Sequence, residues 1–104
     1  MTNVTFFGNE KHFSGFTVTG HCTADSRDTE GRLVCAAVSS AVYMAANTLT
    51  DVENAVCDIN ENDGFLSLKV IKETSGTQTV LKGLYIHLLQ LSEQYSNIEL
   101  NLEV

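Results

Sequence analysis

A run without charged residues, from Leu33 to Thr50, constrains the fold of this chain more than any other feature. The run contains five alanines, and alanine has the highest intrinsic helix propensity. It also contains Ser39, Ser40 and Asn47, and these make it too polar and too short for a membrane-spanning helix. We therefore expect no membrane association, but a helix from Leu33 to about Leu49 that packs on several sides.

Segments rich in Val, Thr and Phe near the start of the chain predict a first β-hairpin. Its strands are Thr2–Gly8 and Phe13–Thr19, with a short polar break between them. A second hairpin is expected after the helix, with strands Ala55–Asn60 and Phe65–Lys72. The dipeptide Asp63-Gly64 supplies the turn of this second hairpin.

The last third of the chain predicts a second helix and a final strand. Ser75 and Gln78 have the spacing of a capping box at a helix start. Apolar residues then recur every three or four positions from Val80 to Tyr95, which is the spacing of one helix face. The segment Ile98–Val104 alternates between apolar and polar residues, as a strand with one solvent-exposed face does.

The resulting order of elements is ββαββαβ. This order predicts an α+β fold in which two helices pack on a mixed, mainly antiparallel sheet. The chain contains no proline, and we find no linker or internal repeat, so residues 1–104 are expected to form a single domain. Hydrophobic residues make up 43% of the chain, which supplies enough apolar surface for a core and excludes intrinsic disorder.

The charge balance is acidic, with 13 Asp and Glu residues against 6 Lys and Arg residues and a formal net charge of −7. Nucleic-acid binding requires clustered basic residues, and those of this chain are scattered, so we expect no direct contact with nucleic acid. A basic partner is favoured instead. The start of the chain lacks the pattern of a signal peptide, and the odd number of cysteines favours a reducing compartment, so we expect a cytoplasmic protein.

His21 and Cys35 are the residues best suited to carry chemistry. His21 follows Gly20 at the end of the second expected strand, and Cys35 lies in the first turn of the expected helix. The positive end of a helix stabilises a thiolate, and unpaired amides such as those of Cys35 and Ala36 stabilise an oxyanion. The pair predicts acyl transfer, with Cys35 as nucleophile and His21 as general acid and base. On position alone, a packing role remains the commoner one for a cysteine in an alanine-rich helix.

We consider two other roles of the cysteines, a metal site and a redox switch. A metal site built from Cys22, Cys35, Cys57 and His21 lacks the close paired spacing of structural zinc ligands, so we expect no metal and no other cofactor. A disulfide between Cys22 and Cys35 would instead make the two residues a redox switch.

A specific motif surrounds the candidate pair. It consists of Gly20-His21, a polar loop, and the run Val-Cys-Ala-Ala-Val-Ser-Ser at 34–40. This pattern resembles the ribosomal-processing cysteine protease family, Prp. The resemblance implies a cysteine endopeptidase that removes the short N-terminal extension of a large-subunit ribosomal protein precursor. It further implies that His21 and Cys35 are catalytic, that Ser39 and Ala36 belong to the substrate-binding part of the site, and that the protein is a homodimer.

The chain departs from the family pattern around the candidate site. Cys22 stands where the family usually has alanine after its histidine, and the polar loop is slightly longer than usual. The family often has an acidic residue three positions before the nucleophile, and this chain has Arg32 there. We therefore expect a catalytic dyad, unless Asp25, Asp28 or Glu30 replaces the missing acid.

The resemblance also implies an apolar groove for the substrate. Phe6, Phe16 and Tyr43 are candidates for its lining, although a core position is the more common one for each of them. The alternative function is a non-catalytic acidic module that binds a basic ribosomal protein, with Cys35 as a packing residue. Rapid alkylation of Cys35 at neutral pH distinguishes the protease from this alternative.

Overall fold

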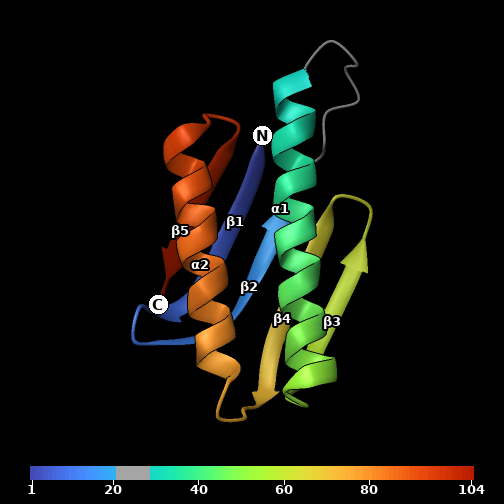
Figure 1. The fold of residues 1–104 in the computed structure, drawn as a ribbon, viewed down its shortest axis with the longest axis vertical. Coiled ribbons are helices and arrows are strands. Elements are labelled where there is room, and N and C mark those ends of the chain that lie inside the picture. Colours follow the sequence, from blue (N-terminus) through green and yellow to red (C-terminus); the bar gives the residue numbers. More distant parts are fainter. Residues whose placement is uncertain (21–28) are drawn as a thin grey trace.

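The computed structural model of the chain describes residues 1–20 and 29–104. Within these residues, five strands form one sheet, and two long helices cover one of its faces (Figure 1). The order along the chain is ββαββαβ, with a short π-helix after the first long helix. The α+β fold expected from the sequence is confirmed, including its mixed and mainly antiparallel sheet.

The sheet has the strand order β3-β4-β2-β1-β5. Neighbouring strands are antiparallel except for β1 and β5, which run in parallel. The first and last strands of the described chain therefore lie side by side (Figure 1). The strands are β1 (Thr2–Asn9), β2 (His12–Thr19), β3 (Val56–Asn62), β4 (Phe65–Lys72) and β5 (Ile98–Glu103).

Local side-chain chemistry explains both hairpin turns. In the first turn, the Oδ1 atom of Asn9 accepts hydrogen bonds from the backbone amides of Lys11 and His12, at 2.8 and 3.1 Å. In the second turn, Gly64 has a φ of 74°, a left-handed conformation that glycine adopts without steric cost. The predicted Asp63-Gly64 turn is therefore confirmed.

The first helix, α1 (Thr29–Asn47), begins earlier than expected and continues into the π-helix η1 (Thr48–Val52). The expected start at Leu33 is wrong, because residues 29–32 are already helical. By length and composition alone, the stretch Thr29–Val52 is apolar enough to cross a membrane. In the fold its inner face belongs to the core, whereas Leu33 and Met44 on other sides are exposed, so the expected packing on several sides holds only in part.

The second helix, α2 (Thr77–Gln94), begins without the expected capping box. Gly76 is the N-cap residue, and no side chain of the Ser75–Gln78 segment caps the helix from that position. Gln78 instead bonds to both the amide and the carbonyl of Phe13, at 2.8 Å each, and so ties the start of α2 to β2. The cap is supplied by Glu53, whose carboxylate accepts the amide hydrogen bond of Gly76 at 3.0 Å.

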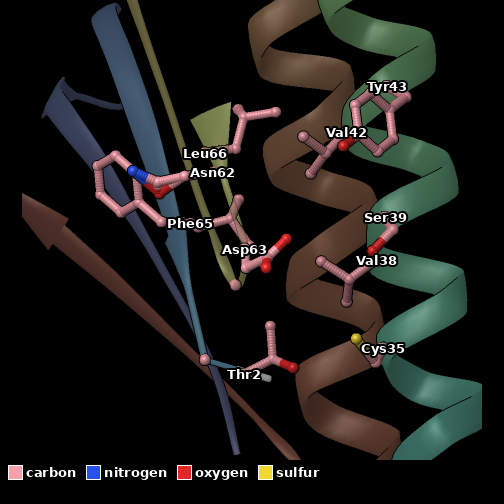
Figure 2. Close-up of a pocket in the computed structure, with 13 residues that line it drawn as sticks. Thr2, Cys35, Val38, Ser39, Val42, Tyr43, Asn62, Asp63, Phe65 and Leu66 are labelled. Atoms are coloured by element: carbon pink, nitrogen blue, oxygen red, sulfur yellow. The ribbon is translucent and has the colours of Figure 1, made fainter. Parts of the chain in front are cut away.

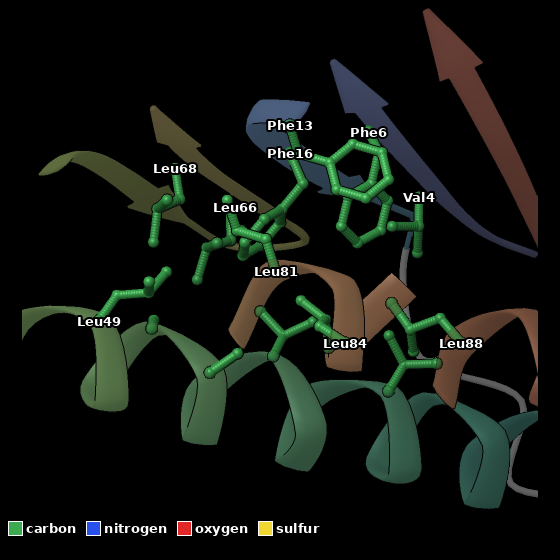
Figure 3. Packing of buried hydrophobic residues seen from close by; sticks show 14 of the residues in the cluster. Val4, Phe6, Phe13, Phe16, Leu49, Leu66, Leu68, Leu81, Leu84 and Leu88 are labelled. Atoms are coloured by element: carbon green, nitrogen blue, oxygen red, sulfur yellow. The ribbon is translucent and has the colours of Figure 1, made fainter. Parts of the chain in front are cut away.

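The core lies between the sheet and the two helices. Phe6, Phe13 and Phe16 project from β1 and β2 towards Leu81 and neighbouring leucines of α2 (Figure 3). Phe6 and Phe16 have no exposed surface, so they are core residues and do not line a surface groove. Full burial of each such side chain stabilises the folded protein by about 1.5–3 kcal/mol. These core residues hold α1 and α2 at fixed positions on the sheet.

Candidate active site

A cleft of about 420 Å³ lies between α1 and the end of the sheet at which β2 stops and the β3–β4 hairpin turns (Figure 2). Valine and leucine side chains from α1, β2 and β4 make it largely apolar. Three parts of the fold supply its other functional groups: Cys35, Ser39 and Tyr43 from α1, Gly20 from the end of β2, and Asp63 from the hairpin turn.

Cys35 and Ser39 lie one helical turn apart on the face of α1 that borders the cleft (Figure 2). Cys35 is 7% exposed, whereas Ala36 is exposed and does not line the cleft. Because α1 starts at Thr29, Cys35 is in the second turn and not in the first as expected. The amides of Cys35 and Ala36 therefore lie beyond the first four amides of the helix, which are the ones without an intrahelical partner.

The oxidation state of Cys35 matters for its chemistry. The structure contains Cys35 in its disulfide-bonded form, and Cys57 is the free cysteine among the described residues. A sulfur in a disulfide cannot attack a carbonyl, so nucleophilic chemistry at this position requires the reduced thiol. Cys57 is half-buried beside the core, and burial raises the pKa of its thiol.

Gly20 is the residue to which His21 is bonded, and it lines the cleft. Its φ of 104° is strained for any residue with a Cβ, and a Cβ there would overlap the carbonyl oxygen of Met1. The amide of Gly20 donates a hydrogen bond to the carbonyl of Gly64 at 3.1 Å, which fixes the end of β2 beside the hairpin turn. Glycine before His21 is thus a structural requirement.

Several expected residues have no described position or no place in the cleft. His21, Cys22, Asp25 and Asp28 lie outside the described residues, so the pairing of His21 with Cys35 stays a prediction. Glu30 and Arg32 are exposed on the first turns of α1, and neither lines the cleft. Among the described residues, no group of three or more His, Cys, Asp or Glu side chains is placed to hold a metal ion.

The rim of the cleft carries two polar side chains, Tyr43, which was a candidate for the groove lining, and Asp63, which was not. Tyr43 lines the cleft, and its hydroxyl donates a hydrogen bond to Glu61 that raises the pKa of the tyrosine. Asp63 also lines the cleft, although the sequence indicated only a turn residue at this position. The sequence feature that could have suggested a place for Asp63 in the site was an acidic side chain in a turn next to a strand end.

Solved structures of known proteins share this fold. The essential ribosomal processing protease Prp from S. aureus, in complex with a substrate peptide, has a TM-score of 0.86 and 23% identity, over 99% of this chain and 100% of that one. The same protease with a covalently linked product peptide gives 0.85 and 22%, with the same two shares. A protein from Streptococcus mutans gives 0.78 and 18%, over 99% of this chain and 94% of that one.

The family comparison reaches further than the fold. No curated protein matches the chain. The sequence model of one protein family, described as cysteine protease Prp, matches residues 1–98. That range includes β1 to β4, both long helices and every residue of the cleft wall. The chain therefore belongs to the cysteine protease Prp family.

Proposed function

We propose that this chain is a single-domain cysteine endopeptidase that removes the N-terminal extension of a large-subunit ribosomal protein precursor. The observation that carries the proposal is the position of Cys35 on the wall of a cleft that also includes Gly20, to which His21 is bonded. The family assignment supports the protease over a non-catalytic binding module. The S. aureus relatives are described as ribosomal processing proteases bound to substrate or product peptides, which supports a peptide substrate.

In the proposed mechanism, the reduced thiol of Cys35 is the nucleophile. His21 takes the thiol proton, and the sulfur attacks the carbonyl carbon of the scissile peptide bond. His21 then gives the proton to the leaving amine, which leaves an acyl-enzyme at Cys35. Water, deprotonated by His21, hydrolyses this thioester and restores the thiol. Ser39, one turn after Cys35 on the same wall, contacts the bound peptide in this scheme.

The walls of the cleft fit the substrate that the family resemblance implies. Val18, Val38, Val42 and Leu66 line the cleft and form an apolar surface for apolar side chains near the cleaved bond. The acidic balance of the chain suits a basic ribosomal protein and argues against direct binding to nucleic acid. We place the protein in the cytoplasm, where such a precursor is made.

We further propose that the protein is a homodimer. The support in the structure is a second groove, between α1 and α2 on the side away from the sheet, with a volume of about 760 Å³. Small and apolar residues such as Ala37, Ala41, Met44 and Leu84 line this groove and allow close approach of a second chain. Light scattering tests the dimer, and Met44→Asp is expected to shift the mass towards the monomer.

The decisive experiment incubates the reduced protein with the full-length precursor and measures the product by mass spectrometry. The wild type and Cys57→Ala, the matched control, are expected to release the extension at similar rates. Cys35→Ala is expected to leave the precursor intact while still binding it. An intact precursor with the reduced wild type contradicts the proposed function, and cleavage by Cys35→Ala contradicts the assignment of the nucleophile.

A further inference from the structure

Asp63 places a negative charge on a cleft wall whose other described residues carry no fixed charge. It lies at the tip of the β3–β4 hairpin, and Figure 2 shows its carboxylate directed across the cleft towards the face of α1 that carries Val38 and Ser39. Every other described residue that lines the cleft is neutral at pH 7 in this structure. Among the residues that the structure describes, a substrate in the cleft therefore meets one fixed charge, opposite the helix that carries the proposed nucleophile.

The carboxylate of Asp63 is unpaired within the described residues, in contrast to that of Glu61 on the same hairpin. Over residues 1–20 and 29–104, the structure gives it no hydrogen bond and no ion pair. Glu61, two residues earlier on the same hairpin, accepts the hydrogen bond of Tyr43, and Glu73 is paired with His12. No lysine or arginine within this part of the chain lines the cleft. The charge of Asp63 is thus available to a ligand.

We propose that Asp63 is a specificity-determining residue that binds a lysine or arginine side chain of the substrate. The proposal rests on the proposed function, because it takes the cleft beside Cys35 as the place where the peptide binds. A carboxylate beside apolar walls attracts a cationic group and rejects an anionic one. The apolar walls accept the methylene groups of a lysine or arginine while the charged end reaches the rim.

The size of the cleft limits where this basic residue stands. A volume of about 420 Å³ holds only a few side chains. Since Cys35 and Asp63 line the same cleft, the basic residue must lie within a few positions of the cleaved bond. The substrate class is therefore a peptide that combines an apolar residue and a nearby basic residue at the cleavage site.

The test uses two peptides that differ at one basic position near the cleaved bond, with lysine in one and uncharged norleucine in the other. The wild type is expected to favour the lysine peptide by several-fold to about tenfold in kcat/KM, through a lower KM, and added salt is expected to reduce this preference. Asp63→Asn is expected to remove the preference. Asp63→Lys is expected to cleave a third peptide, with glutamate at the same position, faster than the lysine peptide. Asp58→Asn, on the exposed part of β3 outside the cleft, is the matched control.

Two results overturn the proposal. The first is an Asp63→Asn variant that keeps the full preference for lysine. The second is an Asp63→Asn variant whose kcat falls equally for both peptides, because that result indicates a positioning role in proton transfer. Equilibrium binding of the two peptides to Cys35→Ala and to Cys35→Ala/Asp63→Asn separates this question from cleavage. Loss of the lysine preference in the double variant supports the role of Asp63 even where cleavage fails and the proposed function falls.

Discussion

The carboxylate of Glu53 accepts a hydrogen bond from the backbone amide of Gly76 at 3.0 Å, so a residue that follows the first helix caps the second one. The same oxygen accepts the hydroxyl of Thr74 at 2.7 Å. A negative charge at this place also interacts favourably with the positive end of the helix dipole. The contact joins the end of η1 to the start of α2, and so fixes the two helices to each other.

Glu53→Ala is expected to lower the free energy of unfolding by about 1–2 kcal/mol, because it leaves the amide of Gly76 without its partner. Glu53→Gln keeps an acceptor oxygen at the same place and is expected to lose less. Urea unfolding measures both values. Glu93→Ala, which removes an exposed carboxylate near the other end of α2, is the control and is expected to change little. Equal losses for Glu53→Ala and Glu93→Ala would show that the cap is without effect.

Gly76→Ala is expected to destabilise the protein for a steric reason. The φ of Gly76 is −95°, which alanine adopts freely, but a Cβ at this position would overlap the carboxyl group of Glu53. The flexible Glu53 side chain would have to move away and give up its hydrogen bonds to Gly76 and Thr74, and the loss of these bonds is the expected cost. In the background of Glu53→Ala this carboxyl group is absent. Gly76→Ala is therefore expected to cost much less stability in that background than in the wild type. A double-mutant cycle measures this difference. Additive losses would contradict the contact.

Glu73 and His12 predict a specific loss of stability in acid. The Nε2 atom of His12 lies 2.7 Å from the carboxylate of Glu73. This hydrogen bond is the largest cause, and a hydrogen bond from Gln78 the second, of a pKa of Glu73 below its ordinary value of 4.5. A lowered pKa in the folded state stabilises the fold above the ordinary value, and this contribution disappears as the pH falls through the lowered one. Wild type and Glu73→Gln are therefore expected to differ in urea midpoint near neutral pH and to converge in acid. A constant difference across the series would contradict the pair.

Cys35 is expected to react with iodoacetamide about tenfold faster than Cys57, or more, once the protein is reduced. The pKa of the Cys57 thiol is raised by burial, so little of it is thiolate at neutral pH. Peptide mapping of the alkylated, folded protein gives both rates. Without a reductant, Cys35 is expected to stay unlabelled and the protease inactive, because the structure contains this residue in its disulfide-bonded form. Equal rates in the reduced protein would remove the argument for a thiolate nucleophile.

His21→Ala is expected to slow the chemical step by about 10²–10⁴-fold, the usual effect of losing a positioned acid and base. Because no acid stands at position 32, Asp25→Asn, Asp28→Asn and Glu30→Gln are each expected to cost far less. Single-turnover cleavage of the precursor, with binding measured separately, compares the four variants. If one carboxylate variant loses as much cleavage rate as His21→Ala, yet still folds and binds the precursor, that carboxylate is the orienting third member of the site.

The strands and hairpins were predictable because their signals are local. The alternation at Ile98–Glu103 and the Asp63-Gly64 turn are both visible within a few residues. The cap of α2 was not predictable in this way, since Glu53 is far from Gly76 along the chain and only folding brings them together. The early start of α1 was not predictable from local composition, because its first turn contains Thr29 and Gly31, two residues of low helix propensity.

The candidate site was partly predictable for the same reason. Cys35 and Ser39 are four residues apart in a helix, so the sequence alone places them on one face. The role of Asp63 depends on the approach of the β3–β4 hairpin to α1, which no local pattern encodes. Gly20 was noticeable in the sequence because it precedes His21. The reason for a glycine there is the close approach of Met1, which is visible only once the sheet is known.

The parallel pairing of β1 with β5 has a mechanical consequence. The pairing runs from Thr2 beside Ile98 to Phe7 beside Glu103, and the chain ends lie at opposite ends of this pair (Figure 1). A force that pulls the two ends apart therefore shears the whole ladder at once and cannot open it one bond at a time. Thr2, which lines the cleft and donates its amide to Asn97 at 2.8 Å, belongs to this shear-loaded pair. Under tension, the part of the cleft wall that Thr2 forms is therefore expected to keep its structure until all bonds of the β1–β5 ladder break together.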